Sequence, residues 1–187
     1  MKKYLKEVKE NDQVLDVGCG EGRLIQGLKA KDYTGIDLSP ALLEIARKRY
    51  PKRRFLERDI STKKGWKNLK KYDKIFCVAV IHHLTKEEEQ LRVMREMRKH
   101  LKKDGQMYLS VWNLRQRKFL KEHLKSLPIK SQTKNWGAVE IPFRQTKEKR
   151  LYTCISERKL KQLANKAGWK NLRLERTKNN LWIKGNI

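Results

Sequence analysis

Short apolar runs alternate along the chain with longer stretches in which apolar residues have helical spacing. The apolar runs are rich in β-branched and aromatic residues and predict strands at residues 14–17, 33–36, 54–56, 74–80 and 106–112. Helical stretches fall between most of these runs. This alternation is typical of a parallel sheet covered by helices, so the pattern predicts an α/β fold.

Three helices have recognisable signals at their ends. Ser39, which a proline follows, predicts an N-cap, and residues 85–88 (Thr-Lys-Glu-Glu) have the form of a capping box. A third helix is predicted to begin at Ser156 and to end at Gly168. Residues 104–105 (Asp-Gly) predict a turn between the second of these helices and the next strand.

The rest of the chain predicts one domain with one irregular part. Residues 172–175 and 181–184 predict a closing antiparallel hairpin. Neither a repeat nor a linker interrupts the sequence, so residues 1–187 are expected to form a single domain. Residues 115–150 fit the pattern least well. We expect them to form an insertion that recognises the substrate at the carboxyl end of the sheet, where open α/β folds bind ligands.

The formal charge of +26 changes the picture of possible partners. It comes from 47 Lys and Arg residues against 21 Asp and Glu residues, spread over the whole chain. Such a field attracts polyanions, whose phosphates release counterions on binding, and this favours a nucleic acid as partner. A generally lysine-rich proteome is the alternative explanation.

The sequence contains no sign of export, of membrane insertion or of a metal site. The longest apolar run, residues 75–81, is far too short to span a bilayer, and no signal region precedes it. The three cysteines, Cys19, Cys77 and Cys154, form no C-x-x-C pair of the kind found in zinc knuckles. We therefore expect reduced thiols in a cytoplasmic protein.

Residues 14–23 (Val-Leu-Asp-Val-Gly-Cys-Gly-Glu-Gly-Arg) carry the most information. A buried strand leads into a glycine-rich turn and then a helix, an arrangement that lets the backbone approach a ligand closely. A dinucleotide site would need the spacing G-x-G-x-x-G, and here the third glycine comes one residue early. Asp16 and Glu21 flank the turn and would repel a pyrophosphate. A ligand with a cationic sulfonium and an amino group would be favoured instead.

Two further acids follow the next two predicted strands. Asp37 ends the second strand and can accept hydrogen bonds from both hydroxyls of a ribose. Asp59 follows the third strand, where its carboxylate can accept a hydrogen bond from an adenine amino group. The alternative is that the glycines only make a tight turn and the acids only cap helices. The joint pattern disfavours this alternative.

Residues 16–22, Asp37, Asp59 and the strand end at 78–84 (Val-Ala-Val-Ile-His-His-Leu) resemble, in order and spacing, the successive motifs of class I S-adenosylmethionine-dependent methyltransferases. The resemblance implies a Rossmann-like fold, with a mostly parallel seven-stranded sheet, helices on both faces and a C-terminal antiparallel hairpin. It also implies that S-adenosylmethionine is held at the ends of the first four strands, by Asp16, Gly18, Cys19, Gly20, Asp37, Leu38, Asp59, Ile60 and Ala79.

Within that superfamily, the chain resembles the tRNA methyltransferases that esterify a carboxymethyl group on the wobble uridine. The matching stretches are residues 79–84, 108–113, 139–143, 149–152 and 156–168. The group usually carries an Arg-Tyr-Tyr-His-like run, from which this chain departs at Leu151 and at Thr153 and Cys154. The resemblance implies tRNA or another structured RNA as substrate. It also implies a small zinc-binding activator protein as a partner, because that group often works with one.

The acceptor group decides which side chains the chemistry needs. A carboxylate is already ionised at neutral pH, so it needs no general base and only a cation to orient it. Arg150 with Tyr152 is the first candidate for this task, followed by Arg115 and Arg144. The displacement itself asks mainly for positioning and desolvation of the two reactants.

An amine or hydroxyl acceptor would instead need a base, and His82 and His83 are the candidates. One of these histidines could equally pack against the cofactor or bond to backbone. Trp112 and Trp136 could stack on a base of the RNA, although Trp112 could equally belong to the core. The segment before the first strand can form only part of a helical lid, so the site is expected to be open or completed by a partner.

Three functions stay open on the sequence alone. The first is an RNA methyltransferase, and the second is a methyltransferase of a small metabolite. The third is a non-catalytic protein of the same fold that binds RNA or scaffolds a complex. Asp16, Gly18, Gly20 and Asp37 argue against the third function, because a non-catalytic module has no physical need for them.

Overall fold

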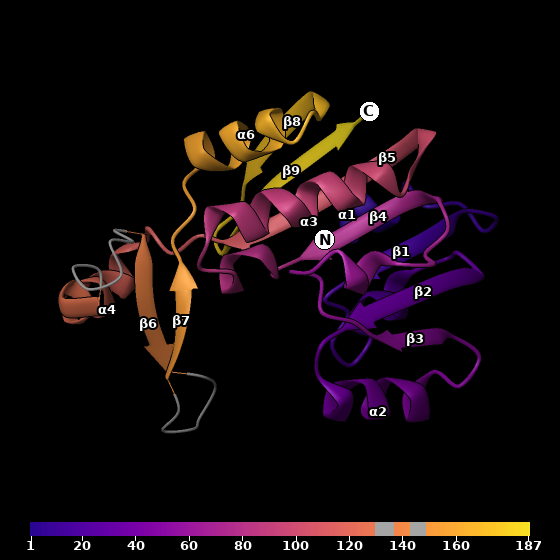
Figure 1. Ribbon diagram of the computed structural model, residues 1–187, viewed down its shortest axis with the longest axis horizontal. Coiled ribbons are helices and arrows are strands. Elements are labelled where there is room, and N and C mark those ends of the chain that lie inside the picture. The colour runs from indigo at the N-terminus through magenta and orange to yellow at the C-terminus, as the bar shows by residue number, and fades with distance from the viewer. Residues whose placement is uncertain (130–136, 143–148) are drawn as a thin grey trace.

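The computed structural model describes residues 1–129, 137–142 and 149–187, and a seven-stranded sheet is its main feature (Figure 1). The strand order is β3-β2-β1-β4-β5-β9-β8. The first five strands pair in parallel, whereas β9 runs antiparallel to both β5 and β8. The strands are β1 (Gln13–Val17), β2 (Asp32–Asp37), β3 (Arg54–Glu57), β4 (Tyr72–Val78), β5 (Leu101–Trp112), β8 (Lys170–Arg176) and β9 (Asn180–Asn186). The predicted mixed sheet with its C-terminal hairpin is confirmed.

Helices and helical turns connect these strands. The α-helices are α1 (Lys2–Leu5), α2 (Pro40–Arg49), α3 (Glu87–Lys99), α4 (Leu120–Lys125) and α6 (Glu157–Lys166). The 3-10 turns are η1 (Arg23–Gly27), η2 (Lys64–Trp66), η3 (Ile81–His83) and η4 (Arg117–Phe119). The predicted caps of α2 and α6 are confirmed, because the Ser39 hydroxyl accepts from the Leu42 amide and that of Ser156 from the Lys159 amide.

Three local predictions are wrong. The capping box at residues 85–88 does not form, since Lys86 is the N-cap of α3 and makes no side-chain capping bond; three glutamates in the first turn complement the helix dipole instead. Residues 104–105 lie inside β5 rather than in a turn, because pairing with β4 begins at Leu101 and the register shifts before Gln106. The helix after the glycine turn is only the 3-10 turn η1, which ends at Gly27 before β2 begins at Asp32.

Two apolar clusters cover the two faces of the sheet. One joins α3 and α6 to strand residues such as Leu15 and Leu109, and these two helices lie on the same side in Figure 1. The other joins α1, η1 and α2 to alternate strand residues such as Val14 and Tyr108. The ring of Tyr4 lies 4.9 Å from that of Trp182, so α1 packs on the sheet face and forms no lid over the strand ends.

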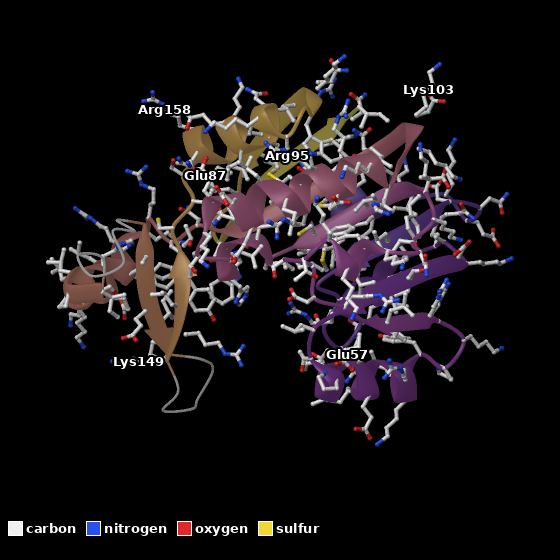
Figure 2. The ribbon with its side chains drawn as sticks, in the orientation of Figure 1. Glu57, Glu87, Arg95, Lys103, Lys149 and Arg158 are labelled. Carbon is white, nitrogen blue, oxygen red and sulfur yellow. The ribbon has the colours of Figure 1, made fainter. Side chains whose placement is uncertain are left out.

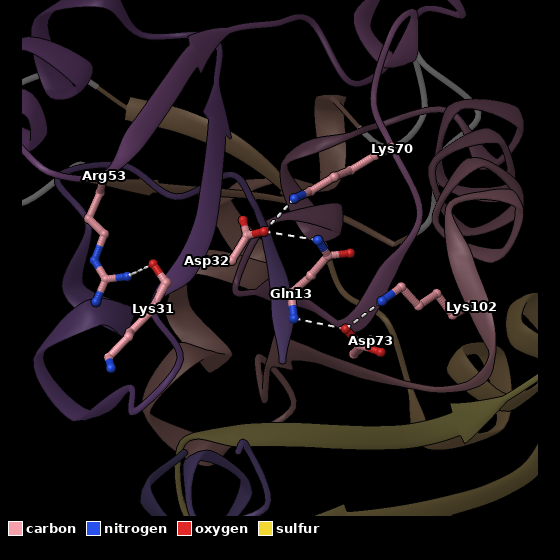
Figure 3. A network of polar contacts seen from close by, with 7 residues as sticks. All are labelled: Gln13, Lys31, Asp32, Arg53, Lys70, Asp73 and Lys102. Carbon is pink, nitrogen blue, oxygen red and sulfur yellow. Dashed lines mark hydrogen bonds and ion pairs between the residues drawn. The ribbon is translucent and has the colours of Figure 1, made fainter. Parts of the chain in front are cut away.

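The amino ends of the central strands are tied together by paired charges (Figure 3). The backbone amide of Gln13 donates to Asp73 at 2.8 Å, and its side-chain amide donates to Asp32 at 3.0 Å. Lys70 pairs with Asp32 and Lys102 with Asp73. The acids at this end of the sheet therefore already have cationic partners.

The insertion expected within residues 115–150 follows β5 and stands away from the main sheet (Figure 1). It contains a small antiparallel sheet of β6 (Ala138–Pro142) and β7 (Lys149–Thr153), which the sequence did not predict. Because β7 continues to Thr153, the insertion extends past the expected boundary at residue 150. Trp136, Phe143 and Arg144 lie outside the described residues. In the part of the chain that the structure describes, no helix is long and apolar enough to cross a membrane.

Candidate functional site

The glycine turn after β1 is locked to the end of β2. The amides of Gly18 and Cys19 both donate to the Ile36 carbonyl, at 2.8 and 3.0 Å. Gly18 has a φ of +71°, and a Cβ there would lie 2.3 Å from the Val80 side chain. Gly20 also has a positive φ, +53°. These conformations and the close approach to Val80 explain why glycine is needed at this turn.

Asp37, at the end of β2, holds the turn with its carboxylate. One oxygen accepts from the Gly20 amide at 2.8 Å, and the other accepts from the Ser39 amide at 2.9 Å. A carboxylate offers about four acceptor positions, so about two remain for a ligand. The next side chain, Leu38, is 64% exposed and is free to cover an apolar ring.

Asp59 follows β3 and also keeps acceptor capacity. Its Oδ1 accepts from the Ser61 amide at 2.9 Å and from the Ser61 hydroxyl at 2.7 Å. Its Oδ2 accepts no hydrogen bond from the described residues. The next carbonyl, of Ile60, accepts from the Trp66 indole at 2.9 Å. A Cβ at Gly65 would lie 1.9 Å from the Asp59 carbonyl oxygen, so this glycine is required for the loop to close.

Unlike the acids at the amino ends of the strands, Asp37 and Asp59 form no ion pair with any described residue. Both side chains are partly exposed, so each carboxylate can meet a ligand. Within a molecule of charge +26, unpaired carboxylates at one end of the sheet favour a cationic ligand there. This contrast with the Asp32 and Asp73 pairs points to the carboxyl end as the binding end.

Asp16 and Glu21 differ from these two acids. Asp16 is 4% exposed, and its carboxylate accepts from the Tyr33 hydroxyl at 2.9 Å. Burial raises the pKa of Asp16 to about 7, so its carboxyl is partly protonated at neutral pH. Glu21 forms an ion pair with Arg49 at 3.1 Å. The argument for a cationic ligand therefore depends mainly on Asp37 and Asp59.

Ala79, just after β4, has a strained left-handed backbone conformation. Its φ is +59°, which costs a residue with a Cβ about 1–3 kcal/mol. Its amide donates to the Ser110 carbonyl at 3.0 Å and lies 3.2 Å from the Ser110 hydroxyl. Ser110 is fully buried in β5 and was not singled out from the sequence. The sequence did contain a signal for Ser110, because this serine interrupts the apolar run of the strand.

Four rings gather where β4 and β5 end, and we call them the aromatic cluster: His82, His83, Trp112 and Tyr152. The rings of His82 and His83 stack at 4.8 Å, and those of Trp112 and Tyr152 at 5.1 Å. His82 also lies 5.0 Å from Trp112, and His83 lies 4.8 Å from Tyr152. Tyr152 comes from β7, so the insertion supplies one of the four rings.

The two histidines have different environments within the aromatic cluster. His82 has no exposed surface, and its two ring nitrogens have no partner among the described residues. Burial lowers the pKa of His82 to about 3, so its ring is neutral and weakly basic. His83 is exposed. The packing of its ring lowers its pKa, and so does the charge of Arg150, while the Ala79 backbone and Asp37 act in the opposite direction.

The insertion brings Arg150 to the aromatic cluster as well. Burial raises the pKa of Tyr152, and the nearby Arg150 charge partly offsets this effect. Arg150 precedes Tyr152 by two residues on β7, so the two side chains leave the strand on the same face. The charges of Arg150 and Asp37 act on the pKa of His83 in opposite directions. Arg115 lines a different hollow, of about 490 Å³, under the insertion. The predicted residues Tyr152, His82 and His83 are therefore brought together, and Arg150 lies on the same strand face as Tyr152.

Comparison with known proteins identifies the family. A model described as "Methyltransferase domain" matches residues 1–174. The chain belongs to this methyltransferase family. Its fold is that of an S-adenosylmethionine-dependent methyltransferase from Methanosarcina mazei, with a TM-score of 0.80 at 20% identity over 99% of this chain and 97% of that one.

Two curated relatives of this chain are tRNA methyltransferases. A probable tRNA methyltransferase 9B from Homo sapiens is 27% identical over 123 residues, which are 63% of this chain and 25% of that protein. A tRNA (carboxymethyluridine(34)-5-O)-methyltransferase from Saccharomyces cerevisiae is 33% identical over 103 residues, 54% of this chain and 36% of that protein. The chain therefore spans between a quarter and two fifths of these relatives.

The observed donor set fits S-adenosylmethionine. Asp37 has spare acceptor positions for hydroxyl groups, and Asp59 has a spare oxygen for an amino group. The glycine turn places the backbone of Gly18 against Val80 and that of Gly20 beside Asp37. The exposed Leu38 offers an apolar surface beside Asp37.

Proposed function

We propose that this methyltransferase acts on tRNA and esterifies a carboxymethyl group on the wobble uridine. The observation that carries the proposal is the position of Tyr152, whose ring β7 brings to within 4.8 Å of the His83 ring at the end of β4, with Arg150 two residues earlier on the same face of that strand. A guanidinium is the side chain best suited to hold a carboxylate. The likeness to two tRNA methyltransferases supports the same substrate class.

In this proposal the cofactor is held by the ends of the first four strands. When bound, S-adenosylmethionine supplies an electrophilic methyl group on a sulfonium. Asp37 accepts from the ribose hydroxyls and Asp59 from the adenine amino group, while Leu38, Ile60 and the backbone of Ala79 line the adenine. Residues 18–20 contribute backbone, and Asp16 supports the turn from behind through Tyr33.

The acceptor is positioned by the insertion. Arg150 holds the carboxylate, and Tyr152 with the rest of the aromatic cluster excludes water from one side of it. No general base is required, because the acceptor is already ionised, and a neutral, fully buried His82 agrees with that. In-line transfer then depends on orientation and desolvation of the two reactants.

The surface charge supports a polyanionic substrate. Figure 2 shows Lys149 projecting from β7 and Arg158 from α6, and both side chains are exposed. Among the residues of the insertion that the structure describes, the exposed basic ones are Arg115, Arg117, Lys118, Lys121, Lys125, Lys149 and Arg150. Together they offer a surface for phosphates beside the aromatic cluster.

The proposal includes a cytoplasmic location and a small zinc-binding activator protein as a partner. Activity of the purified chain by itself would show that this partner is dispensable.

Incubation with labelled S-adenosylmethionine and total tRNA, followed by mass analysis of the nucleosides, tests the proposal. The expected product is a methylated carboxymethyl nucleoside whose label is released by mild alkali, because esters hydrolyse there and N-methyl groups do not. Log affinity for tRNA should fall steeply with log salt. Activity that is insensitive to salt and to added tRNA would favour a metabolite as substrate.

A further inference from the structure

A second hollow lies next to the aromatic cluster, where the insertion meets the β8–β9 hairpin. It has a volume of about 250 Å³ and is lined by Trp112, Gln116, Lys118, Phe119, Asn179 and Asn180. The Asn113 amide donates to the Asn179 carbonyl at 2.9 Å, which holds the hairpin turn against the end of β5. Neither the hollow nor its lining has a role in the cofactor and acceptor sites described above, apart from Trp112.

The lining combines groups that recognise a nucleobase. Trp112 and Phe119 provide aromatic surface, and the Lys118 ammonium lies 4.9 Å from the centre of the Phe119 ring. The side-chain amides of Asn179 and Asn180 make no hydrogen bond to any described residue, so each can donate and accept at the edge of a base. Stacking on aromatic rings and bonding to base edges is how proteins recognise single-stranded RNA.

We propose that this hollow receives one base of the RNA, adjacent to the nucleotide that is methylated. The inference depends on the RNA methyltransferase function proposed above and goes beyond it by assigning a subsite for a flanking base. Its position follows from Trp112, which belongs both to the aromatic cluster and to the wall of the hollow. Its size suits a single base, since pockets for drug-sized ligands measure roughly 300–1,000 Å³.

The neighbouring hollow of about 490 Å³ supplies cations for the backbone of the same nucleotide. Gln116 lines both hollows, and the larger one also contains Arg115 and Arg117. The Gln116 side chain is held in place, because its amide donates to the Asn113 carbonyl at 2.8 Å. A base in the smaller hollow would therefore leave its phosphate close to two guanidinium groups, which bind phosphate well.

The test compares tRNA binding by Phe119→Leu and Phe119→Ala with that of a matched control, Leu124→Ala. Leu124 is 58% exposed on α4 and lines neither hollow. Loss of one stacked base should raise the Kd for total tRNA about 5- to 150-fold in the Phe119 variants. Phe119→Tyr, which keeps the ring, should bind like the wild type. The affinity for S-adenosylmethionine should be unchanged in all four variants.

Salt dependence separates the base contact from the phosphate contacts. Phe119→Leu should leave the slope of log affinity against log salt unchanged, because no charge is lost. Arg117→Gln should reduce that slope by about one. Ultraviolet cross-linking of bound tRNA should place a base on the peptide that contains Phe119 or on the one that contains Trp112.

The two proposals fail in different ways. Wild-type Kd values in the Phe119 variants, with tRNA still methylated, would overturn the base subsite and leave the proposed function standing. Wild-type protein that binds S-adenosylmethionine but neither binds nor methylates tRNA would overturn both proposals.

Discussion

The indole of Trp112 stacks on the phenol of Tyr152, with ring centroids 5.1 Å apart and 27° between the ring planes. Trp112 is the last residue of β5, and Tyr152 lies in β7, so the contact joins the main sheet to the insertion. The Thr153 hydroxyl donates to the Leu84 carbonyl at 3.1 Å and strengthens this junction. The part of β7 that contains Tyr152 is thereby held against the strand ends.

Replacing Tyr152 with Phe should distinguish the contribution of the ring from that of the hydroxyl group. Tyr152 is 1% exposed and its ring stacks within the aromatic cluster, so Tyr152→Phe keeps the ring packing and should lower the unfolding free energy by only about 1 kcal/mol. If the hydroxyl orients the acceptor, kcat/KM for tRNA should fall about 5- to 10-fold. Urea titration and initial rates check the two effects. A normal kcat/KM would restrict Tyr152 to a packing role.

Arg150→Gln should impair methyl transfer to a carboxylate while leaving cofactor binding intact. Loss of a charge-assisted hydrogen bond costs about 1.5–3 kcal/mol, so kcat/KM should fall about 10- to 150-fold. Lys149→Gln is the matched control, because it removes the same charge from the adjacent residue of β7. Lys149 forms only an exposed ion pair with Glu140 at 3.4 Å, and such pairs contribute little to stability. Equal losses in both variants would mean that Arg150 contributes only general surface charge.

Asp37→Asn should weaken binding of S-adenosylmethionine. The amide nitrogen of Asn accepts no hydrogen bond, so one bond at the Gly20 or Ser39 amide and the negative charge are both lost. We expect the Kd measured by calorimetry to rise about 10- to 150-fold. Asp32→Asn, at the amino end of the same strand, is the control and should bind the cofactor normally. An unchanged Kd in Asp37→Asn would mean that the ribose does not bind there.

Asp16 should make the fold less stable as the pH rises. Burial raises its pKa from 3.8 to about 7, so between these values the unfolded chain has released a proton that the folded chain retains. Stability is therefore lost as the pH rises through this window. Asp16→Asn keeps an acceptor for the Tyr33 hydroxyl and has no charge. Relative to the wild type, this variant should gain on the order of 4 kcal/mol between pH 4 and pH 8 in urea titrations.

His82 should have the opposite effect. Burial lowers its pKa from 6.5 to about 3, so the unfolded chain binds the extra proton first and stability is lost as the pH falls below 6.5. His82→Leu should therefore resist acid better than the wild type. Near pH 8 it should also gain about 1–3 kcal/mol, because two unpaired buried nitrogens are removed. The effects of Asp16 and His82 on stability cover overlapping pH ranges in the wild type. Each effect is therefore measured as the difference in unfolding free energy between the variant and the wild type at each pH.

The sequence predicted the strands of the main sheet well because each carries a local signal. Residues 14–17 and 106–112 are apolar runs that can be buried only in the middle of a sheet. The insertion was harder, because β6 and β7 form a small two-stranded sheet away from the main one and have no comparable apolar pattern. The predicted capping box does not form, because α3 begins after Lys86 and the three glutamates of its first turn stabilise that helix end through the helix dipole.

By itself the sequence determined the order of the main-sheet strands along the chain, the glycine turn and the positions of Asp37 and Asp59, because these depend on local spacing and backbone freedom. Only the tertiary structure decided which acids keep acceptor capacity, since the burial of Asp16 and the pairing of Glu21 with Arg49 arise from contacts across the fold. It also decided that Tyr152 meets His83 and Trp112, which depends on how β7 folds back against β5. Charge and packing at a site come from neighbours distant in the chain, and no local pattern records them.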